Sequence, residues 1–146
     1  MNTKWKCRFE VIKGENAAII LDGAHNAHGM GAFCAAAGSI LGDVPKTFVL
    51  GMLGEKDCAE SVRRLCKLSN VDFIVTSVPS TRATDCGGLV AELRANGARV
   101  ACDEDCFSAV RAAVDSAPCG GVVCVVGSLY LVGAVREQCM KLMNFH

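Results

Sequence analysis

The sequence predicts a three-layer α/β fold, in which a mostly parallel sheet of six strands carries helices on both faces. Short apolar runs typical of strands alternate along the chain with longer segments of helical periodicity. Most of the strand-like runs are continuously apolar, as expected for strands covered on both faces. The 146 residues suit one domain. A chain of this length can bury about 70% of its unfolded surface, so it needs neither disulfide nor metal to fold.

The first elements are an additional short strand, a buried strand and a helix. "RFEVIK", residues 8–13, predicts the additional strand, which includes Arg8 and ends at the turn "GEN". "AAIIL", residues 17–21, is wholly apolar and predicts a strand inside the sheet. A helix of small residues is expected over 28–41.

Two further strand and helix pairs follow in the middle of the chain. "KTFVLGM" (46–52) predicts a strand, and a helix is expected over 57–68. The apolar face of that helix consists of Cys58, Val62, Leu65 and Cys66. "DFIVTS" (72–77) predicts a third buried strand, and a helix over 86–95 ends at the C-cap signal Asn96-Gly97.

The last third of the chain contains two more pairs. "RVACD" (99–103) predicts a strand, after which Asp105 can cap a helix that ends before Pro118. The expected inward stripe of that helix is Phe107, Val110 and Val114. "GVVCVVGS" (121–128) predicts the last strand, and the last helix is expected over 129–143, with Leu131, Val135 and Leu142 inward.

Composition and cysteine spacing exclude several classes of protein. Lys plus Arg equals Asp plus Glu at 15 each, so no nucleic-acid partner is expected. The start "MNTKWKCRFEVIKG" has no signal-peptide core, and no apolar run reaches the ~20 residues of a membrane span, so we expect a cytoplasmic location and no membrane partner. The ten cysteines include no CxxC pair, and the spacing of Cys102 and Cys106 lacks a second pair for zinc. We therefore expect reduced thiols and no metal site.

Polar side chains gather at one edge of the predicted sheet. The segments that follow the carboxyl ends of the strands are "DGAHNAHG", "GMLGEKD", "SVPSTRA", "DEDC" and "GSLY". The opposite edge carries ordinary turn sequences such as "LGDVPK" and "ANGA". Ligands of doubly wound sheets bind at the carboxyl ends of strands. The sequence therefore predicts a ligand site at this edge.

The same residues also fit simpler interpretations. Asp22 and Asn26 are ordinary capping residues for the helix that begins near residue 28. His25 and His28 have a metal-like spacing, but no third ligand accompanies them. "GMLGEKD" is not a phosphate-binding loop, because the pattern GxxxxGK[ST] is absent from the chain.

Five segments follow one another along the chain, namely "RFEVI", "ILDGAHNAHG", "VLGMLGEKD", "PSTRA" and "GSLYLVGAVR". In order and spacing they resemble the C-terminal domain of folylpolyglutamate synthases and bifunctional dihydrofolate synthases, which are ATP-dependent ligases of the Mur ligase superfamily. "DGAHN" alone also suits peptidoglycan Mur ligases, whereas "RFEVI" and "GSLYLVGAVR" favour the folate branch. The sequence departs from the family where Lys6-Cys7 replaces Pro-Gly and where Ala27 replaces a proline that would stiffen the turn.

The resemblance implies that residues 1–146 form the Rossmann-like C-terminal domain of such a ligase. The family enzymes use ATP and Mg to convert a folate or dihydropteroate carboxylate into an acyl phosphate, which the amino group of L-glutamate attacks. Their phosphate-binding loop, carbamylated lysine and magnesium ligands belong to a central domain that is absent here. We therefore expect the chain alone to be inactive and to bind no cofactor tightly.

The resemblance also implies roles for individual residues. Asp22 corresponds to the aspartate that holds the ATP ribose, and Arg8 to an arginine that contacts the nucleotide. His25 corresponds to the catalytic histidine at the phosphate and glutamate end, and Lys56 to a basic position linked to the incoming glutamate. Arg82 and Ser128 lie in matching loops without an assigned role. Two alternatives stay open, namely a stand-alone α/β nucleotide-binding or regulatory module and the C-terminal domain of a peptidoglycan Mur ligase.

Overall fold

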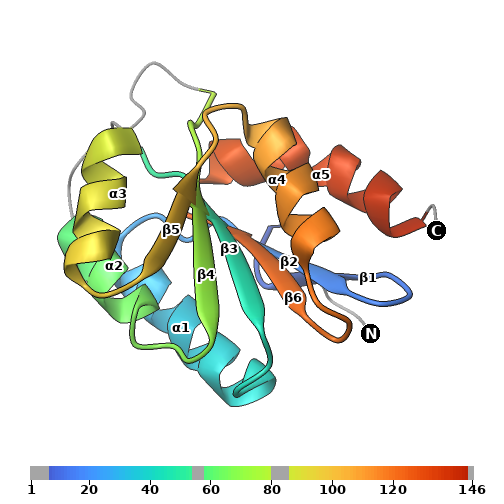
Figure 1. The fold of residues 1–146 in the computed structure, drawn as a ribbon, viewed down its shortest axis with the longest axis horizontal. Helices are drawn as coiled ribbons and strands as arrows, with labels where there is room; N and C mark the ends of the chain where they lie inside the picture. Colours follow the sequence, from blue (N-terminus) through green and yellow to red (C-terminus); the bar gives the residue numbers. More distant parts are fainter. Residues whose placement is uncertain (1–6, 54–57, 80–85, 145–146) are drawn as a thin grey trace.

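The computed structural model describes residues 7–53, 58–79 and 86–144. In these ranges, six strands and five helices alternate in the predicted order (Figure 1). The strands are β1 Glu10–Lys13, β2 Ala18–Asp22, β3 Lys46–Leu50, β4 Val71–Val75, β5 Arg99–Cys102 and β6 Val122–Val126. The helices are α1 Ala27–Leu41, α2 Cys58–Leu65, α3 Cys86–Ala95, α4 Cys106–Ser116 and α5 Leu129–Asn144.

All six strands belong to one sheet, in the order β1-β2-β6-β3-β4-β5. β1 pairs antiparallel with β2, and every other pairing is parallel, as predicted. The register places Asp22 of β2 beside Val126 of β6, and Val126 beside Leu50 of β3. The loops that follow these three strands therefore leave the sheet side by side.

Helices cover both faces of the sheet (Figure 1). α1, α2 and α3 pack on one face, where the buried side chains include Phe33, Leu65 and Leu89. α4 and α5 pack on the other, with Val110 and Leu131 among the buried residues. The continuously apolar strands have both faces covered, which confirms the three-layer prediction.

A row of aromatic rings extends the first core toward the N-terminal side. Phe73 of β4 packs edge-on against Phe48 of β3, with ring centroids 5.6 Å apart. Phe48 packs against Phe33 of α1 at 5.9 Å, and Phe33 against Phe9 at 5.8 Å. Ring contacts at these distances stabilise beyond the area they bury. The segment before β1 is thereby anchored to the core.

Two predictions about the elements are wrong. Arg8 does not lie in the first strand, which begins at Glu10, because the backbone turns at residues 7–9. Phe107 is not part of the inward stripe of α4, since the residue is 48% exposed. The buried face of α4 consists of Cys106, Ala109, Val110 and Ala113, so the helical i, i+3, i+4, i+7 pattern starts one residue before Phe107.

The predicted caps of two helices are present. Asp105 accepts a hydrogen bond from the Phe107 amide at the start of α4. At the end of α3, Gly97 has a φ of 84°, and the Ala98 amide donates to the Leu93 carbonyl, as in a left-handed helix C-cap. None of the helices in the described ranges is long and apolar enough to cross a membrane.

A buried lysine fixes the edge of the sheet opposite the predicted site. Lys46 is 2% exposed, and its ammonium donates to the carbonyls of Gly42, Val44 and Ser69 at 2.7, 2.9 and 2.6 Å. An ammonium has three donors, so all are used. Burial lowers the pKa of Lys46, and the nearby Asp43 partly opposes this effect. Lys46 therefore ties the turns before β3 and β4 together.

Candidate functional site

A cleft of about 780 Å³ opens at the carboxyl end of β2. Its walls are the turn before β1, the loop after β2, the first half of α1 and the first residue of α5. The polar side chains that line it are Arg8, Asp22, His25, Asn26 and His28. The apolar lining includes Phe9, Ala32, Phe33, Ala36 and Leu129. The cleft thus combines an apolar wall with both signs of charge.

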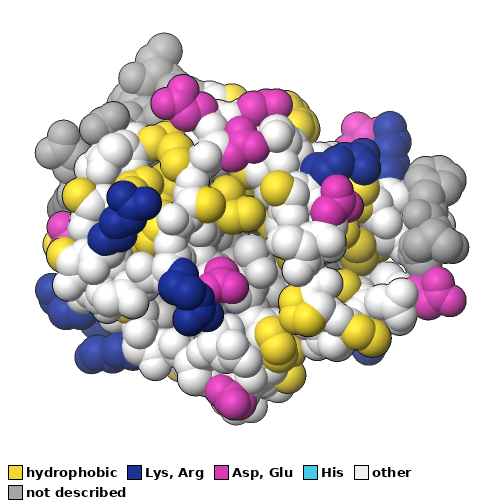
Figure 2. Space-filling view, viewed as in Figure 1, with side chains coloured by type: hydrophobic (Ala, Val, Ile, Leu, Met, Phe, Trp, Pro, Cys, Tyr) yellow, Lys and Arg dark blue, Asp and Glu magenta, His cyan; other side chains and the backbone are white. Residues whose placement is uncertain are grey.

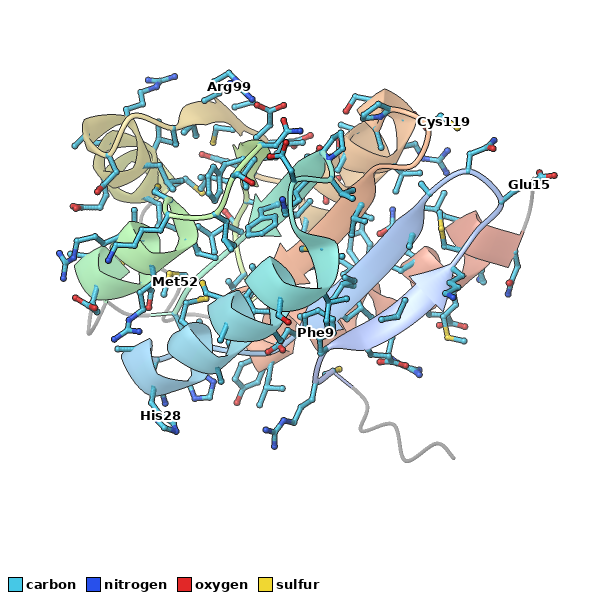
Figure 3. The ribbon with its side chains drawn as sticks, turned by 90° about the horizontal axis from the view of Figure 1, so that it is seen from below. Phe9, Glu15, His28, Met52, Arg99 and Cys119 are labelled. Carbon is cyan, nitrogen blue, oxygen red and sulfur yellow. The ribbon has the colours of Figure 1, made fainter. Side chains whose placement is uncertain are left out.

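Figure 3 shows that the loops after the strands and the turns before them lie at opposite edges of the sheet. His28, in the first turn of α1, and Met52, after β3, lie on one side of the molecule. Glu15, in the turn before β2, and Cys119, before β6, lie on the other. The face over α3, β5 and α4 shows scattered charges of both signs, with acidic groups where the chain passes from β5 to α4 (Figure 2).

Asp22 is the last residue of β2 and is half-buried in the cleft. Its Oδ1 accepts a hydrogen bond from the Ala24 amide at 2.9 Å, and its Oδ2 accepts one from the Phe9 amide at 3.1 Å. Burial raises the pKa of the Asp22 carboxyl, although these two hydrogen bonds and the charge of Arg8 act in the opposite direction. Each carboxylate oxygen keeps a further lone pair, so Asp22 can still accept from a ligand.

The simpler interpretation that Asp22 caps α1 does not agree with the structure. Asn26 is the N-cap, and its Oδ1 accepts from the Gly29 amide at 2.8 Å. Asp22 instead closes the loop that follows β2. The capping interpretation therefore explains Asn26, and it leaves Asp22 as a carboxylate held at the floor of the cleft.

His25 projects from the loop after β2 and is exposed. Its Nδ1 lies 3.0 Å from the Gly23 carbonyl oxygen. A carbonyl can only accept, so Nδ1 carries a proton and the ring is oriented by its own loop. Nε2 then acts as an acceptor when the ring is neutral and as a donor when it is charged.

Gly23 allows the loop after β2 to pass directly beneath α5. A Cβ at this position would collide with the side chain of Leu129, the first residue of α5. The Gly23 amide donates to the Cys7 carbonyl at 2.8 Å, which joins this loop to the turn before β1. Glycine is therefore required here by a close approach, and Leu129 becomes part of the cleft wall.

Of the other residues named by the resemblance, only Ser128 belongs to the described part of the chain, and it does not line the cleft. Lys56 and Arg82 lie outside the described residues. Ser128 follows β6 at the same edge as Asp22, but it is buried, and its Oγ accepts from the amides of Tyr130 and Leu131. Ser128 is thus the N-terminal cap of α5, a role that the sequence did not assign.

No metal centre accompanies these residues in the described ranges, where no group of three or more His, Cys, Asp or Glu side chains is arranged to hold an ion. The ten cysteines are all free thiols. The apolar wall of Phe9, Phe33 and Leu129 was missed by the sequence reasoning. Its members are separated in the chain, and only "GSLY" at a strand end gave a signal for Leu129.

The arrangement suits a ligand with hydroxyl groups, negative charge and an apolar part. A carboxylate can accept two hydroxyl hydrogen bonds, and a guanidinium offers a planar fork for phosphate or carboxylate oxygens. An imidazole beside them can stabilise developing negative charge. Arg8 and Asp22 come from segments joined by two hydrogen bonds, from the Gly23 amide to the Cys7 carbonyl and from the Phe9 amide to Asp22 Oδ2. Both charged residues therefore line the same cleft.

Residues 7–129 match the family described as the Mur ligase, glutamate ligase domain. No curated protein sequence matches the chain. Among solved structures, the chain is similar to the folylpolyglutamate synthase of Thermotoga maritima, with 32% identity and a TM-score of 0.79. That alignment covers 99% of this chain and 32% of the synthase.

Two other solved structures are similar over most of this chain. The Mycobacterium tuberculosis folylpolyglutamate synthase complexed with ADP and AMPPCP is 25% identical, with a TM-score of 0.80 over 93% of this chain and 32% of its own. The bifunctional folylpolyglutamate synthase/dihydrofolate synthase of Yersinia pestis, complexed with AMPPNP and a Mn ion, is 24% identical, with a TM-score of 0.78 over 92% and 31%. The chain spans about a third of the length of these proteins.

Proposed function

The chain belongs to the family of Mur ligase glutamate ligase domains, and from this we propose that it is the C-terminal domain of an ATP-dependent ligase that adds L-glutamate to folate or dihydropteroate. Its membership confirms the superfamily that the sequence motifs predicted. The folate branch is supported by the similar structures, which are folylpolyglutamate synthases. We place such a ligase in one-carbon metabolism in the cytoplasm, where thiols stay reduced.

One observation carries the proposal. Arg8, Asp22 and His25, the three residues for which the resemblance implies nucleotide contacts, line a single cleft at the carboxyl end of β2. Arg8 precedes the sheet and Asp22 ends its second strand, so their meeting follows from the fold and not from adjacency in the sequence. The position is also the one where doubly wound sheets bind ligands.

In the proposed complex, Asp22 accepts hydrogen bonds from the ribose hydroxyls of ATP, and Arg8 donates to its phosphate oxygens. His25 stands where negative charge develops as the carboxylate of the folate substrate becomes an acyl phosphate. Lys56 is assigned to the carboxylate of the incoming glutamate on the basis of the sequence motif alone.

The chain supplies only one side of this site in our proposal. Phosphoryl transfer needs a loop that cradles the phosphates and metal ions that neutralise their charge. The 146 residues contain no GxxxxGK[ST] pattern. We therefore assign the phosphate loop and the magnesium ligands to another domain of the ligase, and we propose that ATP and Mg are held between the two.

A nucleotide titration of the ¹⁵N-labelled chain tests the proposal. With millimolar Mg·ATP, we expect amide shifts concentrated in residues 7–9 and 22–29, and their loss in Asp22→Asn. Asp115→Asn is the matched control, since Asp115 is an exposed carboxylate in α4 that does not line the cleft. Shifts that cluster elsewhere, or that persist unchanged in Asp22→Asn, would refute the nucleotide site.

The substrate class can be determined only with the proposed full-length enzyme. The coding region upstream should encode an in-frame GxxxxGK[ST] segment, and the complete product should ligate glutamate to a folate. An enzyme that instead extends a peptidoglycan precursor would show that the domain belongs to the cell-wall branch. A gene product that lacks the upstream segment would support the stand-alone module.

A further inference from the structure

Two sequence segments that carry the family resemblance contain charged residues with no role so far. "RFEVI" contains Glu10, and "GSLYLVGAVR" ends with Arg136. Although 126 positions separate them, the two side chains form a bidentate ion pair. Arg136 Nε donates to Glu10 Oε1 at 3.0 Å, and Nη2 donates to Oε2 at 2.6 Å.

This ion pair is partly shielded from water, and its arginine is held by a rigid helix. The side chains of Glu10 and Arg136 are 11% and 26% exposed, so solvent screens them less than a surface pair. Arg136 lies in the middle of α5, next to the fully buried Val135 and one helical turn from Val132. The guanidinium is therefore presented by a rigid element, and Glu10 is the partner that it holds.

Glu10 in turn holds the first residue of the turn before β1. Its Oε1, the oxygen that accepts from Arg136, also accepts from the Cys7 amide at 3.0 Å. Cys7 and Phe9 have φ values of 64° and 44°, in the left-handed region that bulky residues rarely adopt. Such a conformation persists only where the surroundings hold it.

The other contacts of this turn lead to the cleft. The Cys7 carbonyl accepts from the Gly23 amide, and the Phe9 amide donates to Asp22 Oδ2. Arg8 is the residue between these two anchors, and it lines the cleft beside Asp22. Hydrogen bonds thus run from Arg136 through Glu10 to the Cys7 backbone on one side of Arg8, while Asp22 holds the Phe9 amide on the other side.

We propose that Glu10 and Arg136 are positioning residues, whose ion pair fixes the turn at residues 7–9 so that Arg8 faces the cleft. The effect on nucleotide binding rests on the function proposed above, whereas the effect on the turn does not. Because Leu129, at the start of α5, lines the same cleft, one helix contributes both a wall of the site and the anchor of its arginine.

Amide hydrogen exchange tests the turn directly. We compare Arg136→Met, which keeps an unbranched apolar stem, with Lys141→Met, which removes an exposed cation farther along α5. Arg136→Met should speed exchange of the Gly23 and Cys7 amides at least tenfold more than exchange of the β3 and β6 amides. Lys141→Met should leave all of them unchanged. Equal acceleration in the turn and in the central strands, or no acceleration of Gly23, would overturn the proposal.

A double-mutant cycle tests whether the ion pair acts through Arg8. We measure Mg·ATP affinity by the amide titration for the parent chain, Arg8→Ala, Arg136→Met and the double variant. Arg136→Met alone should weaken ATP binding about tenfold, the equivalent of one charge-assisted contact. In the Arg8→Ala background it should cause no further loss. An equal loss in both backgrounds would show that Arg136 does not act through Arg8.

A conservative variant separates positioning from general destabilisation. Arg136→Lys keeps the charge but lacks the two-pronged fork, so it should restore part of the Gly23 protection and part of the ATP affinity. No rescue by Arg136→Lys would contradict this expectation, because the retained charge should still attract the Glu10 carboxylate. If the parent chain binds no ATP, the proposed nucleotide site fails, while the exchange experiment still decides whether the ion pair holds the turn.

Discussion

The Phe9 amide donates to Asp22 Oδ2 at 3.1 Å, although 13 positions separate the two residues in the chain. The contact fixes the position of Asp22 in the cleft and the path of the chain past Arg8. Oδ2 of Asp22 thus holds the turn before β1, while the carboxylate keeps further lone pairs that can accept from a ligand. Changes at Asp22 should therefore affect binding and local structure together.

The first prediction concerns kinetic parameters of the proposed full-length ligase. Asp22→Ala should raise the apparent KM for ATP about tenfold, since a charge-assisted contact to bound ATP is lost. His25→Ala should lower kcat as well, because His25 is assigned to the place where charge develops. Steady-state kinetics at saturating folate and glutamate measures both.

The matched control for these variants is Asp115→Ala, an exposed carboxylate of α4 away from the cleft. It should leave KM and kcat unchanged. If His25→Ala also leaves kcat unchanged, His25 is only an exposed loop residue, and the catalytic assignment is wrong.

The second prediction concerns stability at alkaline pH. Burial raises the pKa of Cys139 to about 12, from 9.0 for an ordinary thiol. Because the folded chain keeps a proton that the unfolded chain loses, the contribution of Cys139 is fully present below pH 9.0 and is lost as the pH rises toward about 12. Wild type should therefore lose about 1.4 kcal/mol per pH unit in this window relative to Cys139→Ala.

Urea unfolding of both proteins between pH 7 and pH 10.5 measures this difference. At pH 7, Cys139→Ala should be about 1 kcal/mol less stable than wild type, because a buried sulfur is removed. Cys119→Ala is the control, since Cys119 is exposed. Parallel pH profiles for wild type and Cys139→Ala would contradict the assigned origin of the alkaline transition.

The third prediction compares two glycines near α5. Gly133 lies inside the helix, and a Cβ there would meet nothing within 4 Å, so Gly133→Ala should stabilise the chain by about 0.5–1 kcal/mol. A Cβ on Gly23 would strike Leu129, so Gly23→Ala should destabilise it and displace Leu129 from the cleft wall. Thermal unfolding measures both, and an equal effect of the two substitutions would show that the close approach at Gly23 is not tight.

Elements with a local signal could be predicted from the sequence. The continuously apolar run before Asp22 predicted a strand covered on both faces, and "DGAHN" showed that polar side chains follow directly at its end. The helix over 86–95 agrees residue for residue with α3, because Asn96-Gly97 marks its end. In these cases the structure depends on residues that are neighbours in the chain, so the sequence pattern is enough to predict it.

Features that depend on contacts between distant segments were missed or mistaken. Arg8 was placed in a strand because "RFEVIK" looks extended, whereas the hydrogen bonds of Cys7 and Phe9 to partners outside the segment bend the chain. Phe107 was placed inward because phenylalanine is apolar, yet the packing of α4 favours the smaller residues one position away. No spacing in the sequence indicates that Glu10 meets Arg136.

The last prediction concerns the 146-residue chain alone, which should fold and yet hydrolyse no ATP. Folding is expected because the sheet is covered on both faces and helices α1 and α4 are capped at both ends. Catalysis is not expected, because Arg8, Asp22 and His25 are proposed to contact only one side of a nucleotide and the sequence contains no GxxxxGK[ST] pattern. ATP turnover is measured with folate, glutamate and Mg present, against a heat-inactivated control and His25→Ala. Steady turnover that depends on His25 would show that this domain holds a complete active site, and the proposed division of the site between two domains would then be wrong.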